Sequence, residues 1–199
     1  MKEINLNKGF VTYVDDEDYD LVISTPSGEK EARWFIKFPS KKDNSTPYAV
    51  KKIESKIQKD FYTKIFGSPI TTYQLSLHRL ILKCGPNDIV DHIDRNGLNN
   101  QKNNLRICTP QQNSQNAKIR TDNKTGYKGV RKDPRIKEAS RCWVATIREP
   151  TTKKNITIGY YYSKEEAALA YNEMASRLFG EYAYLNNLNF MWEYNCALL

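Results

Sequence analysis

The sequence of 199 residues has few cysteines, the side chains that form disulfides and structural zinc sites. Its four cysteines, Cys84, Cys108, Cys142 and Cys196, include no C-x-x-C pair. A structural zinc site needs such pairs, and a disulfide framework belongs to short secreted chains, so neither is expected here. We expect free, mostly buried thiols in a reducing compartment.

Long apolar runs are also missing. No stretch is long enough to span a bilayer, and the segment that follows Met1 lacks the pattern of a signal peptide. The composition, with 39% hydrophobic and 27% charged residues, is ordinary for a protein in water, and we expect a cytoplasmic location. The length allows one large domain or two to three small ones, so the division must come from patterns along the chain.

Acidic residues are scarce in one part of the chain. Residues 118–154 contain twelve Lys or Arg against four Asp or Glu, a net charge of +8 that equals the charge of the whole chain. The positive field therefore comes from one stretch, as expected of a surface that binds a polyanion. A solvated basic face that serves only solubility is the alternative. The acidic run at residues 15–18 indicates a solvated helix start rather than a metal site.

Histidine occurs only twice, as His78 and His92. His92 follows Asp91 at the end of a predicted strand, residues 89–92, and a second strand is predicted at residues 105–108, beyond a loop rich in Asn and Gly. Before the first strand, residues 73–84 have apolar side chains at helical spacing and are predicted to pack beneath this region.

A helix is predicted directly after the second strand. Thr109 has the type of an N-cap residue, Pro110 suits the first helical position, and Gln112 stands three residues after the cap. We therefore expect a helix that begins at Pro110 and carries Asn113 in its first turn or just beyond.

These residue types suit the hydrolysis of a phosphodiester. Such a reaction needs a base with a pKa near neutral, such as His92, and a hard cation that stabilises the phosphate and the leaving oxygen. Oxygen ligands suit Mg²⁺ or Mn²⁺. Asp91 and the side-chain carbonyl of Asn113 supply two of them if the strand and the helix lie side by side.

The stretches LHRLIL and VDHIDRNGLNNQKNNLRICTPQQN resemble HNH endonucleases of the phage and intron-borne homing type. The resemblance implies a ββα-metal fold in which His92 is the general base and Asp91 and Asn113 hold the divalent metal. It also implies that Asn104 holds the loop and His92 in position. One departure is Arg95, at a loop position where relatives usually have glycine.

Both histidines also have a structural interpretation. A single histidine is more often structural than catalytic, but the matching spacing of Asp91, Asn104 and Asn113 favours a catalytic His92. For His78, which belongs to the HR pair that relatives place ahead of the motif, we favour a packing or orienting role.

A separate module is predicted after a basic linker, residues 119–126. Its three strand patterns and one helix pattern cover residues 127–131, 141–148, 156–160 and 164–178. Alternation in the middle strand, WVATIR, separates an apolar set, Trp143, Ala145 and Ile147, from a mixed set, Val144, Thr146 and Arg148. We predict that the apolar face packs on the alanine-rich helix and that the other face is open.

The open face is expected to carry donors and cations suited to base edges and phosphates, with Arg131, Asn155 and Thr157 added from the flanking strands. The segments GYKGVR, WVATIREP and IGYYYSKEEAALAYNEMASRLFGEYAYLN resemble the AP2 domain of plant transcription factors and of many phage HNH endonucleases. The resemblance implies DNA contacts from Lys128, Arg131, Thr146, Arg148 and Thr157. The tryptophan of the third strand of plant domains is missing here, so no base preference is carried over.

We therefore predict an α+β protein with five parts. These are an N-terminal α+β segment (1–70), an HNH nuclease unit (71–118), the basic linker (119–126), an AP2-like unit with a three-stranded antiparallel sheet packed on one helix (127–187), and a C-terminal tail (188–199). The expected partner is double-stranded DNA, the expected cofactor is Mg²⁺ or Mn²⁺ with no other small molecule, and the expected state is a monomer.

Two alternatives compete with a metal-dependent DNA endonuclease. A catalytically silent AP2-type DNA-binding regulator has no need to keep Asp91, His92 and Asn113 together. An RNA-binding protein is favoured by basic charge alone, but the open face lacks the aromatic pairs of an RNA-stacking sheet.

Overall fold

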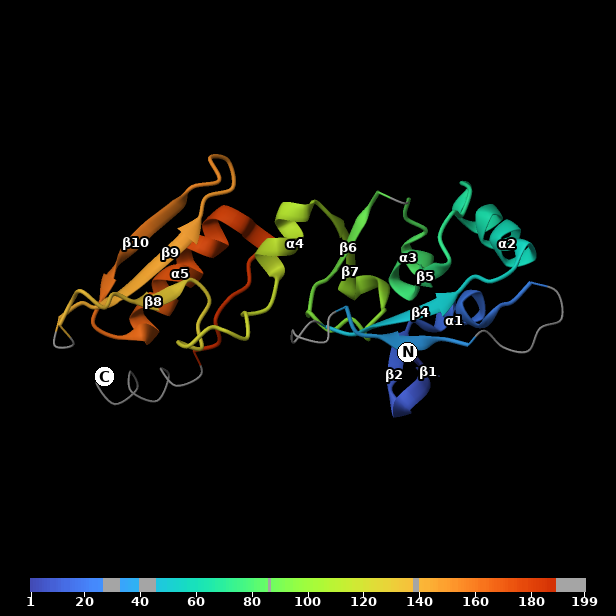
Figure 1. Cartoon of the computed structure of the whole chain (residues 1–199), viewed down its shortest axis with the longest axis horizontal. Coiled ribbons are helices and arrows are strands. Elements are labelled where there is room, and N and C mark those ends of the chain that lie inside the picture. The colour runs from blue at the N-terminus through green and yellow to red at the C-terminus, as the bar shows by residue number, and fades with distance from the viewer. Residues whose placement is uncertain (27–32, 40–45, 86, 138–139, 189–199) are drawn as a thin grey trace. The chain divides into compact units, whose positions relative to one another are not determined.

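The computed structural model describes residues 1–26, 33–39, 46–85, 87–137 and 140–188 (Figure 1). The chain divides into two compact units, Met1–Asn113 and Ser114–Leu199, and the boundary falls inside one helix. The predicted tail from residue 189 onward, with Cys196, lies outside the described residues. No helix within the described residues is long and apolar enough to cross a membrane.

Small antiparallel sheets and short helices make up the first unit, so the predicted α+β class is confirmed. The sheets have the strand orders β1-β2, β3-β4-β5 and β6-β7. In chain order the elements are β1 (Lys2–Asn5), η1 (Asn7–Gly9), β2 (Val11–Val14), α1 (Asp16–Ile23), β3 (Phe35–Lys37), β4 (Tyr48–Lys52), α2 (Lys56–Phe66), β5 (Gln74–Ser76), α3 (Leu77–Leu82), β6 (Ile89–His92), η2 (Lys102–Asn104), β7 (Leu105–Cys108) and α4 (Pro110–Asn116).

A single apolar core joins the N-terminal segment to the region with the HNH motif. Val14 of β2, Leu80 of α3 and Leu105 of β7 belong to one cluster of buried side chains. Trp34 lies in the same cluster and donates a hydrogen bond from Nε1 to the carbonyl of Val22 at 3.1 Å. The two segments that the sequence treats separately therefore stabilise each other by sharing this core.

The start of α4 follows its sequence signals. The backbone N–H of Gln112 donates to Thr109 Oγ1 at 3.2 Å, and the backbone N–H of Thr109 donates to Gln112 Oε1 at 2.8 Å. These reciprocal bonds form a capping box, because each satisfies a donor that the first turn leaves open. The predicted start of the helix at Pro110 is confirmed, and so are the predicted strands β6 and β7.

Two local predictions are wrong in part. The helical pattern of residues 73–84 gives a helix only from Leu77, because residues 74–76 pair with β4 as strand β5 and this tertiary pairing overrides the local preference. The acidic run does begin helix α1, but Asp18 is buried and its carboxylate binds Lys102 Nζ at 2.9 Å rather than facing water.

The second unit contains a three-stranded antiparallel sheet of order β10-β9-β8. Its elements are β8 (Val130–Lys132), β9 (Trp143–Arg148), β10 (Asn155–Tyr161), α5 (Lys164–Phe179) and η3 (Gly180–Tyr182). Ala145 of β9 clusters with Ala167 and Ala168 of α5, and Ile147 clusters with Tyr171. The prediction that this face of the sheet packs on the alanine-rich helix is confirmed.

Gly129 allows the first strand of this sheet to approach α5. Its φ of 76° lies in the left-handed region, and a Cβ atom at this position would collide with the ring of Tyr171. The alternation also predicts Val144 on an open face, but its side chain is fully buried. Val144 lies on the central strand and pairs with Arg131 on one side and Tyr160 on the other, so it has a cross-strand neighbour on each side of the same face.

Candidate active site and nucleic-acid interface

Strands β6 and β7 hold Asp91 directly opposite Arg106. The side chain of Asp91 is 7% exposed and that of Arg106 is 10% exposed. Arg106 donates from Nε and Nη2 to Asp91 Oδ2, at 2.9 Å and 2.8 Å. A buried carboxylate needs a compensating cation, and Arg106 supplies it. Arg106 is not among the site residues predicted from the sequence, although pairing the two predicted strands in antiparallel register places it across from Asp91.

His92 ends strand β6 in a largely buried environment. Its Nε2 atom lies 3.3 Å from Oδ1 of Asn100, and its ring meets that of His78 edge-on, with ring centroids 5.2 Å apart. Burial lowers the pKa of His92, against the hydrogen bond to Asn100 and the nearby carboxylates, which raise it. A lowered pKa keeps the imidazole neutral near pH 7, the state that a general base requires.

His78 lies on α3 and packs between two rings, those of His92 and Tyr48. Burial lowers the pKa of His78 to about 3, with smaller effects from His92 and Arg79. Its Nδ1 atom is buried with no hydrogen-bond partner. This placement fits the packing or orienting role that the sequence favours for His78.

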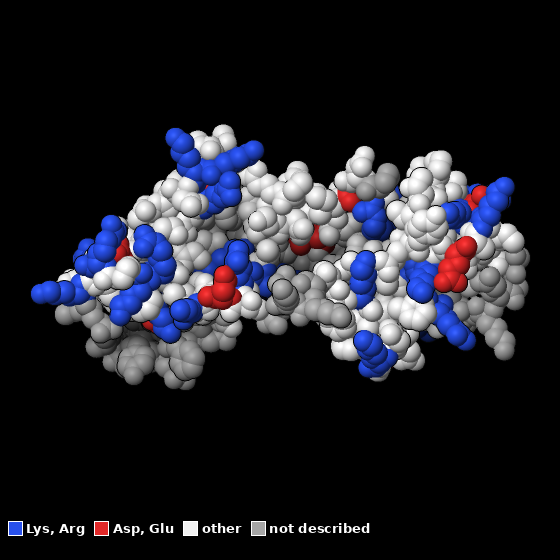
Figure 2. All heavy atoms as spheres, in the orientation of Figure 1, with Lys and Arg blue, Asp and Glu red and all other residues white. Residues whose placement is uncertain are grey.

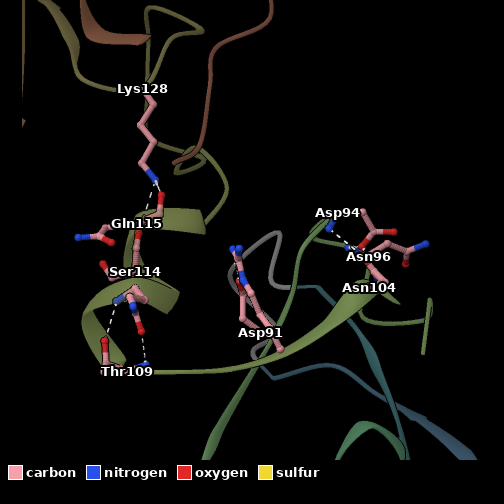
Figure 3. Close-up of polar contacts among 10 residues, drawn as sticks. Asp91, Asp94, Asn96, Asn104, Thr109, Ser114, Gln115 and Lys128 are labelled. Atoms are coloured by element: carbon pink, nitrogen blue, oxygen red, sulfur yellow. Dashed lines mark hydrogen bonds and ion pairs between the residues drawn. The ribbon is translucent and has the colours of Figure 1, made fainter. Parts of the chain in front are cut away.

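Asn104 closes the loop between β6 and β7. Its Oδ1 atom accepts from the backbone N–H of Asp94 at 2.9 Å, and its Nδ2 atom donates to Asp94 Oδ1 at 2.9 Å (Figure 3). The same Nδ2 atom also donates to the carbonyl of Asn99, at 2.8 Å. Burial would raise the pKa of Asp94, but hydrogen bonds from Asn96, Asn99 and Asn104 lower it. Asn104 therefore holds the loop together through Asp94 and Asn99, and its role in positioning His92 stays a prediction.

The backbone at Arg95 shows why relatives usually have glycine at this loop position. Its φ of 63° lies in the left-handed region, which favours glycine. The glycine usual in relatives suits this conformation, and the arginine adopts it at a steric cost.

Asn113 lies in the first turn of α4, where its backbone N–H donates to the carbonyl of Thr109 at 3.0 Å. Within the part of the chain that the structure describes, no group of three or more His, Cys, Asp or Glu could hold a metal ion. The predicted ligands are one carboxylate, Asp91, and one amide carbonyl, Asn113. Both are hard oxygen donors, so their chemistry fits Mg²⁺ or Mn²⁺.

Five of the six side chains predicted to contact DNA share one face of the sheet in the second unit. Residues directly opposite each other in a sheet point to the same side, and so do alternate residues of a strand. The pairs that define this face are Arg131 with Val144, Thr146 with Thr157, and Arg148 with Asn155. Lys and Arg side chains gather around β8, β9 and β10 on the face drawn in Figure 2.

Lys128, the sixth predicted contact, has another position. Its ammonium group donates to the backbone carbonyl of Gln115 at 2.7 Å, at the end of α4 (Figure 3). It also donates to the carbonyl of Ala117, at 2.8 Å. A lysine at a helix C-terminus satisfies carbonyls that lack helical partners. The ammonium also lies 5.0 Å from the ring centre of Tyr184. Lys128 therefore has a structural role, and its contact with DNA stays a prediction.

The thiols agree with the expectation from the sequence. Cys84 and Cys142 are buried, Cys108 is partly exposed, and all three are free cysteines. Burial raises the pKa of the Cys84 and Cys108 thiols, which keeps them protonated and unreactive.

No family model and no solved structure matches the chain. Curated proteins do match it, one of them an HNH endonuclease and others similar only to a shorter segment. The chain is 43% identical, over 125 residues, to the uncharacterized HNH endonuclease L560 of Acanthamoeba polyphaga mimivirus; the match covers 59% of this chain and 60% of that protein.

A shorter segment is similar to plant dehydration-responsive element-binding proteins. It is 47% identical over 60 residues to the dehydration-responsive element-binding protein 2E of Oryza sativa subsp. japonica, covering 30% of this chain and 17% of the relative. It is also 43% identical over 60 residues to the dehydration-responsive element-binding protein 2D of Arabidopsis thaliana, and this match covers 30% of this chain and 27% of that relative. The resemblance to an HNH endonuclease that carries an AP2 domain is therefore confirmed in both of its parts.

Proposed function

We propose that this protein is a metal-dependent DNA endonuclease of the HNH homing type, with an AP2-like unit that binds the target duplex. The observation that carries the proposal is the grouping of Asp91, His92 and Asn104 on the β6–β7 hairpin and its loop, followed directly by the helix of Asn113. The similarity to a viral HNH endonuclease supports the same conclusion.

In this proposal His92 accepts a proton from the attacking water, because its lowered pKa leaves the imidazole neutral. Asn104 keeps the loop closed beside it. Asp91 and Asn113 would hold Mg²⁺ or Mn²⁺, and a bound divalent ion stabilises the negative charge on the phosphate and on the leaving 3′ oxygen. The family resemblance implies 5′-phosphate and 3′-hydroxyl ends.

The sheet face of the second unit is proposed to hold the duplex. Arg131 and Arg148 are exposed on this face, and Asn155 and Thr157 are exposed beside them. Arginines bind phosphates and guanine edges, while amide and hydroxyl groups bind other base edges. The similarity over 60 residues to plant dehydration-responsive element-binding proteins supports a DNA-binding role for this unit.

One observation favours a second function, a catalytically silent DNA-binding regulator. Arg106 already neutralises the buried carboxylate of Asp91, as expected in a protein that uses no metal there. In that case the AP2-like unit would bind DNA and no strand would be cut.

Incubation of the purified protein with supercoiled plasmid separates the two functions. The endonuclease proposal predicts nicked or linear plasmid with Mg²⁺ or Mn²⁺ and intact plasmid after a chelator is added. An Asp91→Asn preparation, made in the same way, controls for contaminating nucleases. Plasmid that is bound in a gel-shift assay but never cut would favour the regulator.

A further inference from the structure

The N-terminal strand β2 lies against the Asn-rich loop of the HNH-like region. The backbone N–H of Tyr13 donates to the carbonyl of Leu98 at 2.9 Å, and the backbone N–H of Asn100 donates to the carbonyl of Tyr13 at 2.8 Å. The hydroxyl of Thr12 also donates to the carbonyl of Leu98, at 2.7 Å. The loop is therefore attached to a segment more than eighty residues away in the sequence.

The donors and acceptors of these hydrogen bonds determine which atom of Asn100 faces His92. The carbonyl of Leu98 can only accept, so the hydroxyl of Thr12 donates to it and accepts from Asn100 Nδ2 at 2.8 Å. The same Nδ2 atom lies 3.4 Å from the carbonyl of Gly97, which also only accepts. The amide orientation of Asn100 is thereby fixed, with Oδ1 directed at His92 Nε2.

An amide oxygen cannot donate, so the Nε2 atom of His92 must carry a proton. In a neutral imidazole the other nitrogen, Nδ1, then holds the basic lone pair. Thr12 and Asn100 are both fully buried, so water is excluded from the hydrogen bonds that link Thr12, Asn100 and His92, here called the relay. Loss of one partner would leave a buried polar group unsatisfied, so the arrangement has little freedom to reorient.

Asp15, at the N-cap of helix α1, and the first turn of that helix bind the far side of the same loop. Asp15 accepts from Gln101 Nε2 at 3.0 Å and from the backbone N–H of Lys102 at 2.8 Å. The ammonium of Lys102 lies 2.9 Å from Asp18 Oδ1 and 2.5 Å from Glu17 Oε1. Burial would raise the pKa of Asp15, but the hydrogen bonds from Lys102 and Gln101 lower it. These contacts restrain the loop that carries Asn100.

We propose that Thr12 and Asn100 are positioning residues that hold His92 in the Nε2–H tautomer and so make Nδ1 its basic atom. The inference rests on the proposed function for the role of His92, and it gives the N-terminal segment, residues 1–70, a part in the reaction. Neither residue contacts the reacting atoms in this proposal.

The tautomer is measured by ¹⁵N NMR of the histidine side chains at about pH 8, where the imidazoles are neutral. The chain has only two histidines, so a His78→Gln spectrum assigns both. The wild-type protein should show His92 as the Nε2–H tautomer. A wild-type spectrum with the proton on Nδ1 overturns the proposal without any variant of the relay.

The matched variants are Thr12→Val, which keeps the shape but removes the hydroxyl, and Thr12→Ser, which keeps the hydroxyl. Thr12→Val should give a mixture of tautomers at His92 and lower kcat roughly 10- to 100-fold with little change in KM, because a wrong tautomer disables the base. Thr12→Ser should resemble the wild type. Thr72→Val removes an exposed hydroxyl that bonds the carbonyl of Gln74, and serves as the control.

The outcomes separate this proposal from the function on which it rests. An unchanged His92 tautomer in folded Thr12→Val overturns the positioning role, whether or not the protein cuts DNA. If the tautomer shifts as expected but the wild type leaves plasmid intact, the relay stands and the endonuclease proposal fails.

Discussion

Arg106 and Asp91 form an ion pair across the two strands of the β6–β7 hairpin, with both side chains almost fully buried. Two nitrogens of Arg106 bind the same carboxylate oxygen, at 2.9 Å and 2.8 Å. The charge of Asp91 is thus balanced from within the protein when no metal is present. A divalent ion held by Asp91 has to share this carboxylate with Arg106.

The first prediction concerns that pair. Arg106→Met should lower the free energy of unfolding of the metal-free protein by about 3–5 kcal/mol, because it leaves a buried carboxylate without a counter-charge. Arg120→Met is the matched control: Arg120 also pairs with an aspartate, Asp122, but in an exposed position where such a pair contributes less than about 1 kcal/mol. Urea denaturation of the three proteins gives the comparison.

Adding Mn²⁺ extends this test to the metal. If Asp91 is a ligand, Mn²⁺ should raise the unfolding midpoint of Arg106→Met more than that of the wild type, since a ligand that binds only the native state stabilises it. The gain should vanish when Asp91→Asn is added. Equal shifts in all three proteins would remove Asp91 from the metal site.

The second prediction concerns DNA binding. Arg131→Gln with Arg148→Gln should weaken duplex binding and reduce the slope of log affinity against log salt by up to about two, because each lost phosphate contact removes about 0.9 from the slope. Lys164→Gln, a basic residue of α5 rather than of the sheet, is the control. Fluorescence anisotropy over a salt series measures both quantities. An unchanged slope in the double variant would mean that this face does not hold phosphates.

The third prediction uses the loop conformation at Arg95. Since φ is 63°, a side chain with a Cβ atom is disfavoured there and glycine is not. Arg95→Gly should therefore be more stable than Arg95→Ala by about 1 kcal/mol, the reverse of their usual order at regular positions. Thermal unfolding of the two variants measures the difference, and a more stable alanine variant would contradict the conformation.

The fourth prediction is a dependence of stability on pH through His78. Its pKa is about 3 in the folded protein and near 6.5 when unfolded, so the unfolded chain binds one more proton between these values. The stability present above pH 6.5 is then lost as the pH falls, by up to about 1.4 kcal/mol per pH unit. His78→Gln should show a shallower decline between about pH 6.5 and 5 in urea denaturation. Parallel declines would mean that His78 titrates normally.

Local signals predicted much of the site region. Strands β6 and β7 and the start of α4 follow from short apolar runs bounded by turn residues and from the Thr109 cap. The packing of α5 on Ala145 and Ile147 follows from strand alternation. Each of these predictions rests on a pattern that spans a few residues of one strand or helix, which is what a sequence records.

Features that depend on distant contacts were not predictable in this way. The bond between Asn100 and Thr12 joins residues 88 positions apart, and no local pattern distinguishes Asn100 from the other asparagines of the loop. The sequence predicts a solvated Asp18, because its partner in the ion pair, Lys102, lies far along the chain. The bond from Lys128 to the end of α4 also depends on how the chain folds back, so the sequence does not predict it.

The central claim is that His92 acts as the base of a phosphodiester hydrolysis, and it is tested most directly by cleavage and binding measured on the same His92→Ala preparation. With target duplex and Mg²⁺ under single-turnover conditions, the cleavage rate should fall by about 10²- to 10⁴-fold, while duplex affinity stays within about twofold, because a general base acts mainly in the transition state. Cleavage by His92→Ala at the wild-type rate would contradict the claim.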